Sequence, residues 1–245
     1  MQPLVVANWK MNTGISDASV LATMVRNQLH EFNGVDVVLC PPFIWLQEVA
    51  SILEISDPRI KLGAQNCYPE KDGPFTGEIS VSMLQELCSY IIVGHSERRE
   101  HFGENNEFIN EKVHACLRYN LTPILCVGEK QKSENSQKKI LKDLIECLEG
   151  VTKDELAKIV VAYEPVWSIS TATQGDIASG EYANEVCELI KKEVGKETPV
   201  LYGGSVTSLT VDNYISQKSI DGVLIGGSSL NANNFVGICK KARGE

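Results

Sequence analysis

The amino-acid sequence predicts a single α/β domain over residues 1–245, folded as a (β/α)8 barrel. Short β-branched apolar runs alternate with amphipathic stretches along the whole chain. The runs are continuously apolar, as in parallel strands whose two faces are both covered by helices. No linker, low-complexity tract or long charge run divides the series, and such barrels reach about 250 residues as one domain.

Eight strands are expected from these runs. Each run is short, rich in Val, Ile and Leu, and followed by a polar or glycine-containing segment. The expected strands are Leu4–Asn8, Val35–Cys40, Ile60–Gln65, Tyr90–Gly94, Thr122–Val127, Ile159–Glu164, Val200–Gly203 and Gly222–Gly226.

Helical patterns fill the intervals between the expected strands. Two apolar stripes repeat at helical spacing: Ile109, Val113, Cys116 and Leu117, and then Ala183, Val186, Cys187, Ile190 and Val194. Thr152 and Glu155 have capping-box spacing, so a short helix is expected before the sixth strand. The lysine-rich region Lys130–Lys142 is interpreted as a solvated helix face.

A doubly wound open sheet is the alternative fold. Such sheets usually have fewer strands and, when they bind a dinucleotide, a Gly-x-Gly-x-x-Gly turn after the first strand. Here the first strand leads into Asn8-Trp9-Lys10-Met11-Asn12, which contains no glycine. The barrel is therefore favoured, and no dinucleotide cofactor is expected.

Composition excludes several classes of function. The net charge of −9 argues against a nucleic-acid surface, which needs a basic face. The eight cysteines are scattered without a Cys-x-x-Cys pair, so we expect free thiols in a reducing compartment rather than disulfides or a metal site. The N-terminus has no basic leader, and no apolar run approaches the ~20 residues of a membrane span. A soluble cytoplasmic protein is expected.

Barrels carry their chemistry at the carboxyl ends of the strands. The candidate groups at these ends are Asn8 and Lys10 (first strand), His95 and Glu97 (fourth), Glu164 (sixth), Gly203, Gly204 and Ser205 (seventh), and Gly226 and Gly227 (eighth). Each group alone has an ordinary structural explanation: a solvated lysine, a satisfied histidine, a glycine turn. Their convergence on one mouth of a barrel favours an active site.

The two Gly-Gly turns indicate a phosphorylated substrate. Glycine lets backbone N–H groups come close to an anion, and Ser205 adds a hydroxyl beside them. Phosphate sites after the seventh and eighth strands recur in barrels of this kind. We expect a small phosphorylated substrate.

Glu164 is the candidate general base. It closes an apolar run and precedes Pro165, so its carboxylate is expected to be held in place and partly desolvated. Burial raises the pKa of a carboxyl group and strengthens it as a base toward a C–H proton. With Lys10 and His95 to steady an oxygen that gains charge, the set suits proton transfer next to a carbonyl group. That is the chemistry of an isomerase.

Five motifs at these strand ends resemble the triosephosphate isomerase family, over the whole length of the chain. They are Asn8-Trp9-Lys10-Met11-Asn12, Gly94-His95-Ser96-Glu97-Arg98-Arg99, Ala162-Tyr163-Glu164-Pro165-Val166-Trp167, Tyr202-Gly203-Gly204-Ser205 and Asp221-Gly222-Val223-Leu224-Ile225-Gly226-Gly227. The resemblance implies a TIM barrel that interconverts dihydroxyacetone phosphate and D-glyceraldehyde 3-phosphate through an enediolate, in glycolysis and gluconeogenesis.

The resemblance also implies roles for single residues. Glu164 would move the proton, and His95, neutral at a helix N-terminus, would polarise the carbonyl group. Lys10, with Asn8 beside it, would supply positive charge, and Glu97 would orient the site. The segment from Pro165 onward would be a lid that shuts out water, with a backbone N–H of Ser170 on the phosphate.

A homodimer is a further implication of the resemblance. The segment Cys67–Glu78, with Gly73, Phe75, Thr76 and Gly77, resembles the family's interface loop. Thr76 would reach the active site of the partner near Lys10. No nucleic-acid or membrane partner is expected.

The lid is where the sequence departs from the family. The family commonly runs Trp-Ala-Ile-Gly-Thr-Gly, whereas this chain has Trp167-Ser168-Ile169-Ser170-Thr171-Ala172, and the following stretch to Ala178 is longer. If the closed lid needs a positive φ at Ser170, a non-glycine residue costs about 1–2 kcal/mol. We expect an active enzyme whose lid closes by different backbone angles, the alternative being weaker phosphate binding and leakage of the enediolate.

Two other functions remain open at this stage. One is a Schiff-base aldolase with Lys10 as nucleophile, which would leave Glu164 and His95 unexplained. The other is a catalytically weakened barrel that binds phosphate or a protein partner. Cys126 lies in a stretch the family often carries and is interpreted as packing rather than as a nucleophile.

Overall fold

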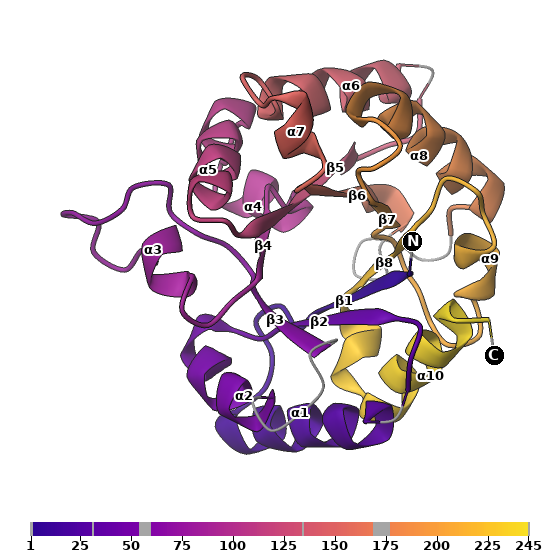
Figure 1. Ribbon diagram of the computed structural model, residues 1–245. Coiled ribbons are helices and arrows are strands. Elements are labelled where there is room, and N and C mark those ends of the chain that lie inside the picture. Colours follow the sequence, from indigo (N-terminus) through magenta and orange to yellow (C-terminus); the bar gives the residue numbers. More distant parts are fainter. Residues whose placement is uncertain (1, 31, 54–59, 134, 169–176, 245) are drawn as a thin grey trace.

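Eight parallel strands form a closed barrel at the centre of the computed structural model (Figure 1). The structure describes residues 2–30, 32–53, 60–133, 135–168 and 177–244. Each strand pairs with the next along the chain, and β1 pairs with β8 to close the sheet. The strands are β1 Leu4–Asn8, β2 Asp36–Cys40, β3 Ile60–Ala64, β4 Tyr90–Val93, β5 Thr122–Glu129, β6 Val160–Pro165, β7 Val200–Tyr202 and β8 Gly222–Ile225. All eight expected strands are confirmed, with ends that differ by at most two residues.

Helices surround the barrel, as the alternating pattern predicts (Figure 1). They are α1 Ile15–Leu29, α2 Leu46–Leu53, α3 Val81–Leu84, α4 Ser96–His101, α5 Asn106–Arg118, α6 Ser136–Cys147, α7 Lys153–Leu156, α8 Gly180–Val194, α9 Asp212–Ile215 and α10 Ala232–Ala242, with 3-10 turns η1 Phe43–Trp45, η2 Val166–Ser168 and η3 Gly227–Leu230.

The local signals for helices are confirmed. The predicted capping box opens α7: Thr152 and Glu155 each accept a hydrogen bond from the other's backbone N–H. The second apolar stripe is the buried face of α8. The lysine-rich region becomes helical only from Ser136, where α6 begins.

Strand residues alternate between two apolar cores. Leu4, Val6, Val38, Ile92 and Leu224 belong to a cluster of side chains that fills the barrel interior. The intervening strand residues face outward and pack on the helices in a second, larger cluster. Because both faces of the sheet are covered, the strands are mostly apolar on both faces, as expected for parallel strands.

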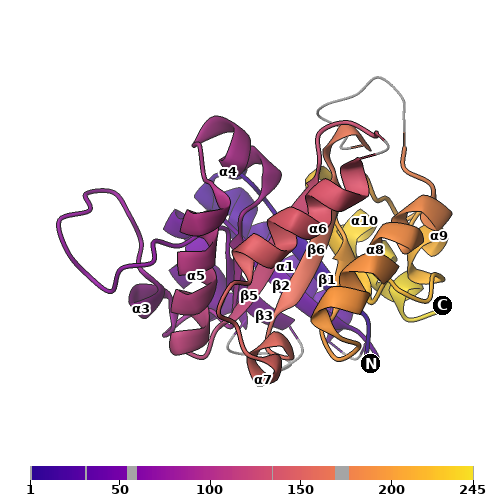
Figure 2. The same cartoon turned by 90° about the horizontal axis from the view of Figure 1, so that it is seen from above.

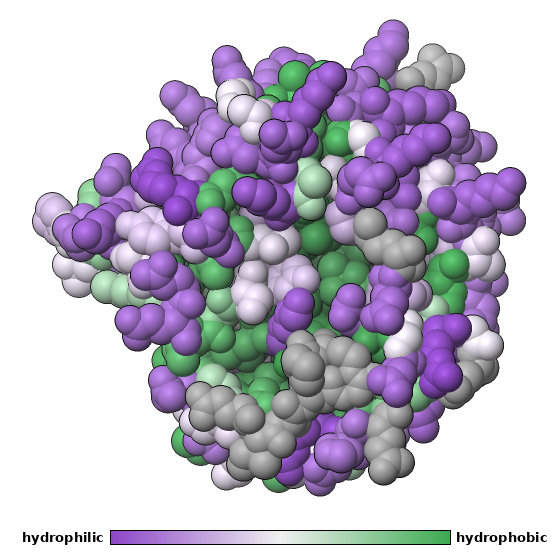
Figure 3. Space-filling model, viewed as in Figure 1, coloured by the Kyte–Doolittle hydropathy of each residue, from purple (hydrophilic) through white to green (hydrophobic). Residues whose placement is uncertain are grey.

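Hydrophilic side chains cover most of the rim in the space-filling view, and apolar surface gathers toward the centre of that face (Figure 3). All eight cysteines are buried and free. Among the described residues, no helix has the length and apolar character needed to cross a bilayer.

The two ends of the barrel differ. In the view from above, α4 lies at the end opposite to α7 and the N-terminus (Figure 2). Because α4 follows β4 directly, that end carries the carboxyl ends of the parallel strands. A long loop before α3 projects from the side of the barrel in both ribbon views (Figures 1 and 2).

Candidate active site

A cavity of about 340 Å³ lies at the carboxyl ends of the strands. Most of the residues singled out at those ends line it. They are Asn8, Lys10, His95, Glu164, Gly203, Gly204, Ser205, Gly226 and Gly227. The predicted convergence of five strand ends on one site is therefore found in the structure.

Glu164 is held at the wall of this cavity by two donors. It lies near the end of β6, and only 2% of its surface is exposed. Its Oε2 accepts a hydrogen bond from the backbone N–H of Ser96 at 2.9 Å. Its Oε1 lies 2.9 Å from Nε2 of His95. Both carboxylate oxygens are thus oriented by groups at the start of α4.

The predicted direction of the Glu164 pKa shift is wrong. Burial is the largest single influence and raises the pKa, as expected. The charge and hydrogen bond of His95, the Ser96 N–H and the Lys10 ammonium together outweigh it and lower the pKa of Glu164 below its usual value. The carboxylate is therefore ionised and ready to accept a proton, but its basicity in this arrangement is reduced by its partners.

His95 caps α4 and has a defined tautomer. Its Nδ1 accepts a hydrogen bond from the backbone N–H of Glu97 at 3.2 Å, so this nitrogen carries no proton. Its Nε2 then carries the proton and donates to Glu164. This arrangement is that of a neutral imidazole, the form that the resemblance implies.

The carboxylate of Glu164 acts against that neutral form. Burial, the largest influence, lowers the pKa of His95, but the charge and hydrogen bond of Glu164, helped by Glu97, raise it above its usual value. The Glu97 N–H favours neutral imidazole while Glu164 favours imidazolium. The state of His95 therefore depends on whether Glu164 keeps its contact with Nε2.

Lys10 is fixed at three points. Its Nζ lies 2.5 Å from Oε1 of Glu97, and its backbone N–H donates to Oδ1 of Asn8 at 3.0 Å. Gln65 donates from Nε2 to the carbonyl oxygen of Lys10 at 2.9 Å and also to Cys40 O at 2.8 Å. Lys10 has a φ of 53°, unusual for a residue with a side chain. Local strain at this position is held by the hydrogen bond to Asn8 in the same segment and by those with Glu97 and Gln65 in two other segments.

The glycines after β7 and β8 make room for the charged side chains. A Cβ on Gly203 would lie 3.0 Å from Cγ of Glu164, and one on Gly226 would lie 3.1 Å from Cε of Lys10. Both turns line the cavity. The hydroxyl of Ser205 donates to the carbonyl oxygen of Ser168 at 2.8 Å, so it is bonded to the segment that follows β6.

Comparison with known proteins shows the family of this chain. A family model described as triosephosphate isomerase matches residues 3–242. The chain belongs to the triosephosphate isomerase family. It is 43% identical to the triosephosphate isomerase of Dehalococcoides mccartyi strain CBDB1, with 98% of this chain and 96% of the relative covered. The enzymes so named in Dictyoglomus thermophilum (42% identity; 97% and 98% covered) and Saccharopolyspora erythraea (39%; 99% and 97%) are similar over their whole lengths.

Three residues expected from the triosephosphate isomerase resemblance do not line the described cavity; one is Glu97, whose Oε1 contacts Nζ of Lys10. Thr76 is exposed on the projecting loop and does not line the site of its own chain. Ser170 lies outside the described residues, as does most of the expected lid, residues 169–176.

Glu129 is a buried residue that the sequence analysis did not single out. Its Oε1 accepts hydrogen bonds from the hydroxyls of Tyr163 (2.9 Å) and Tyr182 (3.0 Å) and from Nε1 of Trp167 (2.9 Å). It thereby fixes residues on both sides of Glu164. The sequence carried one sign of this residue: like Glu164, Glu129 is a lone Glu at the end of an apolar strand.

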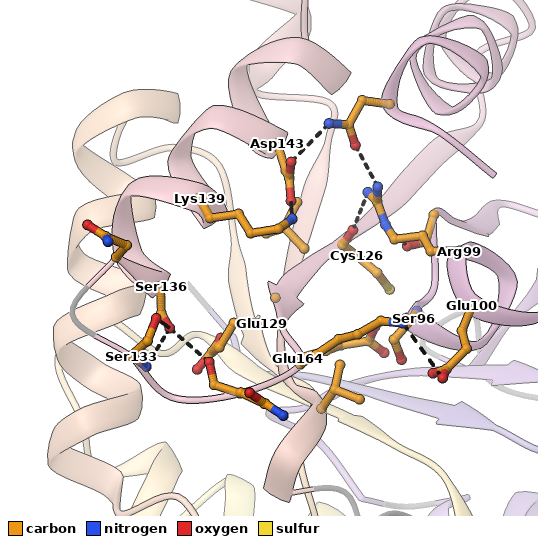
Figure 4. A pocket seen from close by; sticks show the side chains of 18 of the residues that line it. Ser96, Arg99, Glu100, Cys126, Glu129, Ser133, Ser136, Lys139, Asp143 and Glu164 are labelled. Carbon is orange, nitrogen blue, oxygen red and sulfur yellow. Dashed lines mark hydrogen bonds and ion pairs between the residues drawn. The ribbon is translucent and has the colours of Figure 1, made fainter. Parts of the chain in front are cut away.

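A second cavity of about 670 Å³ lies between β5 and helices α4, α5 and α6 (Figure 4). Glu164 lines both cavities, but Lys10, His95 and the glycine turns line only the smaller one. Polar groups in the larger cavity are paired with each other: Lys139 with Asp143 at 2.6 Å, and Arg99 with the carbonyl oxygens of Gly94 and Cys126. The smaller cavity is therefore the candidate substrate site.

Cys126 lies beside Glu164 but is not a nucleophile. Burial, with the nearby charge of Glu164 as the next influence, raises the pKa of its thiol well above the usual value. A protonated, fully buried thiol packs as a small apolar group. This agrees with the interpretation made from the sequence. Among the described residues, no three His, Cys, Asp or Glu side chains form a group that could hold a metal ion.

Proposed function

We propose that the chain interconverts dihydroxyacetone phosphate and D-glyceraldehyde 3-phosphate, with Glu164 as the base and His95 and Lys10 as the groups that stabilise the enediolate. One observation carries the assignment of roles: a buried carboxylate lies 2.9 Å from an imidazole N–H at the wall of a small cavity. The cavity volume suits a substrate of triose size.

The reaction begins when the substrate enters between Glu164 and His95. A substrate oxygen accepts the hydrogen bond from Nε2 of His95 that Glu164 accepts in the free protein. Oε1 of Glu164 is then free to remove a proton from the adjacent carbon. The electron pair of that C–H bond becomes the C=C bond of the enediolate, and charge develops on the oxygen. Nε2 of His95 gives its proton to that oxygen and takes back the proton of the hydroxyl on the other carbon. Glu164 then returns its proton to the former carbonyl carbon: the C=C electron pair forms the new C–H bond, and the oxyanion on the other carbon becomes the new carbonyl group.

Losing the His95 contact also restores basicity to Glu164. His95 is the partner that most lowers the pKa of Glu164 in the free protein. When Nε2 turns to the substrate, burial is opposed by fewer stabilising groups and the pKa of Glu164 rises. The stronger base thus forms only when a substrate is present.

Lys10 supplies a fixed positive charge. Its short contact with Glu97 orients the ammonium, and the turns after β7 and β8 hold the phosphate group. A Schiff-base aldolase would need Nζ of Lys10 to attack a carbonyl carbon, whereas here Nζ is held on Glu97, and Glu164 and His95 would have no role. The backbone N–H of Ser170 completes phosphate binding in this proposal.

We propose that the active protein is a homodimer. The loop bearing Thr76 is closed at its base by the pairing of Tyr68 with Ser80 and stiffened by the Tyr68–Phe75 ring contact at 4.5 Å. Large apolar side chains are exposed elsewhere, Met11 at 97% and Phe102 at 67%. A second copy that received the loop would cover such side chains and bring Thr76 toward Lys10 of the partner. Sedimentation velocity tests this: a monomer at micromolar concentration would contradict it.

Free thiols support a cytoplasmic location. All eight cysteines are buried without disulfides, which suits a reducing compartment. We therefore propose that the protein acts in the cytoplasm.

The test of the proposed function is steady-state conversion of glyceraldehyde 3-phosphate by the purified protein. Glu164→Gln should reduce kcat/KM by about 10²–10⁴-fold or more, because a positioned base is lost. Glu188→Gln is the matched control, since Glu188 is 53% exposed and pairs with Lys192 on α8. Absence of turnover by the folded wild-type protein would contradict the proposal and favour a weakened phosphate-binding barrel.

The altered lid has its own test. Ser170→Gly should raise kcat/KM and reduce elimination of phosphate from the enediolate if the serine restricts closure. Equal rates and equal phosphate release in the variant and the wild type would show that Ser170 does not restrict closure.

A further inference from the structure

Ser168 connects three segments that meet beside the substrate cavity. It is the last residue of η2, directly after β6, and 1% of its surface is exposed. Its hydroxyl oxygen accepts a hydrogen bond from the backbone N–H of Ala178 at 2.8 Å. Its carbonyl oxygen accepts one from the hydroxyl of Ser205 at 2.8 Å. One buried residue therefore joins the chain after β6, the chain before α8 and the loop after β7.

The partners of Ser168 are themselves held by buried groups. The carbonyl oxygen of Ala178 accepts a hydrogen bond from the hydroxyl of Tyr214 at 2.9 Å. The ring of Tyr214 stacks on that of Tyr202, with centroids 3.9 Å apart. Tyr202 ends β7 and immediately precedes the glycine turn. Ala178 is thus fixed through its N–H by Ser168 and through its C=O by Tyr214.

Only the Ser168 side chain makes the first of these bonds possible. The triosephosphate isomerase family commonly has alanine after this tryptophan, and alanine has no oxygen for the Ala178 N–H. A buried backbone N–H without a partner is costly, so the hydroxyl removes a defect that alanine would leave in this backbone arrangement. The substitution is matched to the local structure of this chain.

We propose that Ser168 is a positioning residue for substrate phosphate, acting through Ser205 and Ala178. Ser205 lines the substrate cavity beside the turn Gly203-Gly204, and its side chain is oriented by Ser168. Ser168 also follows Glu164 by four residues on the same segment, so it sets the distance between the base and the phosphate-binding turn. This inference rests on the proposed function, because it concerns the same site.

Ser168→Ala is the primary test. It should weaken the binding of inorganic phosphate and raise KM for glyceraldehyde 3-phosphate by about fivefold, because the backbone segment whose carbonyl oxygen accepts from Ser205 loses its own anchor on Ala178. The change in kcat should be small, because phosphate contacts are made in both the ground state and the transition state. Phosphate binding is measured by titration calorimetry, and backbone amide exchange reports directly on the Ala178 N–H, which should lose protection.

Two further variants separate this role from packing. Ser168→Cys keeps nearly the same volume but offers only a weak acceptor, so it should behave like Ser168→Ala. Ser179→Ala removes the adjacent cap of α8, where Ser179 accepts from the Tyr182 N–H at 3.2 Å. It should lower the melting temperature while leaving Ala178 protection, phosphate affinity and KM unchanged.

The outcomes are distinct. Weaker phosphate binding and faster Ala178 exchange in both Ser168 variants, but not in Ser179→Ala, would support the proposal. Unchanged phosphate affinity, unchanged Ala178 protection, or wild-type behaviour of Ser168→Cys would overturn it. Absence of turnover in the wild type would instead contradict the proposed function, and the calorimetric and exchange measurements would still decide the role of Ser168.

Discussion

Nε2 of His95 and Oε1 of Glu164 lie 2.9 Å apart, and each group changes the proton affinity of the other. The pKa of His95 is raised and that of Glu164 is lowered, although burial alone would move both in the opposite directions. The free site is therefore a coupled acid–base pair rather than two independent groups. Substrate entry must separate this pair before proton transfer can begin.

Removing the charge of Glu164 should lower the pKa of His95. In Glu164→Gln the two influences that raise the His95 pKa most are lost, whereas burial, which lowers it, remains. The His95 imidazole should titrate above its usual value near 6.5 in the wild type and well below the wild-type value in the variant. Nitrogen-detected NMR titration of the ring measures both, and an unchanged His95 pKa would contradict the coupling.

Stability should depend on pH through the same pair. Because the pKa of Glu164 is lowered by folding, its contribution is present above about 4.5 and is lost as the pH falls through the folded value. Because the pKa of His95 is raised by folding, its contribution is complete below about 6.5 and is lost as the pH rises through the folded value. The stability advantage of the wild type over Glu164→Gln should be largest between these limits, as measured by urea unfolding at several pH values. An advantage that kept rising above pH 8 would contradict this assignment.

The sequence sufficed where a local rule applied. Apolar runs located the strands, because a strand is formed by residues close together in the chain. Once the strands were located, the rule that barrel chemistry lies at their carboxyl ends placed Lys10, His95 and Glu164 at one cavity. The pKa direction at Glu164 could not be predicted this way. It depends on Ser96 and His95, which lie almost seventy residues earlier and contact Glu164 only in the folded barrel.

Other features of the site were hidden for the same reason. Nothing in the sequence near Glu129 indicates that one carboxylate oxygen receives three donors from β6, η2 and α8. The Ser205 hydroxyl was expected on the phosphate, but it donates a hydrogen bond to the carbonyl oxygen of Ser168, 37 residues earlier. Hydrogen-bond partners across elements are decided by packing and not by spacing along the chain.

Replacing Lys10 should remove most of the activity without unfolding the protein. Lys10→Met deletes the ammonium that faces the cavity. We expect kcat/KM to fall by about 10²-fold or more, as for other charges aimed at a developing oxyanion. Lys192→Met is the control, because Lys192 is 62% exposed on α8. Steady-state rates of both variants, with circular dichroism to verify folding, provide the measurement. A loss below threefold in Lys10→Met would show that its charge is not used.

Gly203→Ala should disturb the base itself. The new methyl group would lie 3.0 Å from Cγ of Glu164 and 3.2 Å from the carbonyl oxygen of Tyr163, so the Glu164 side chain must shift. A shift of this size costs about tenfold or more in kcat, since proton transfer depends on sub-ångström placement. Gly14→Ala is matched to it, because its methyl group would meet only Oδ2 of Asp17, at 3.8 Å. Equal kcat in the two variants would argue against a steric role for Gly203.

Lys112 should be important for stability and for the projecting loop. Its side chain is 1% exposed, and Nζ donates to Oε1 of Glu104 at 2.6 Å and to Oδ1 of Asn66 at 2.8 Å. Asn66 begins the chain that leads into the loop with Thr76. Lys112→Met removes the cation but leaves the buried Glu104 carboxylate, so the free energy of unfolding should fall by about 3–5 kcal/mol.

Because the start of the loop also loses its anchor, the dimer should dissociate at higher protein concentration than the wild type. Urea unfolding and sedimentation velocity measure the two effects, with Lys139→Met as the control, since Lys139 is 66% exposed. A variant as stable as the wild type would show that Glu104 is neutralised by Arg98 alone, whose Nε contacts the same Oε1 at 2.5 Å.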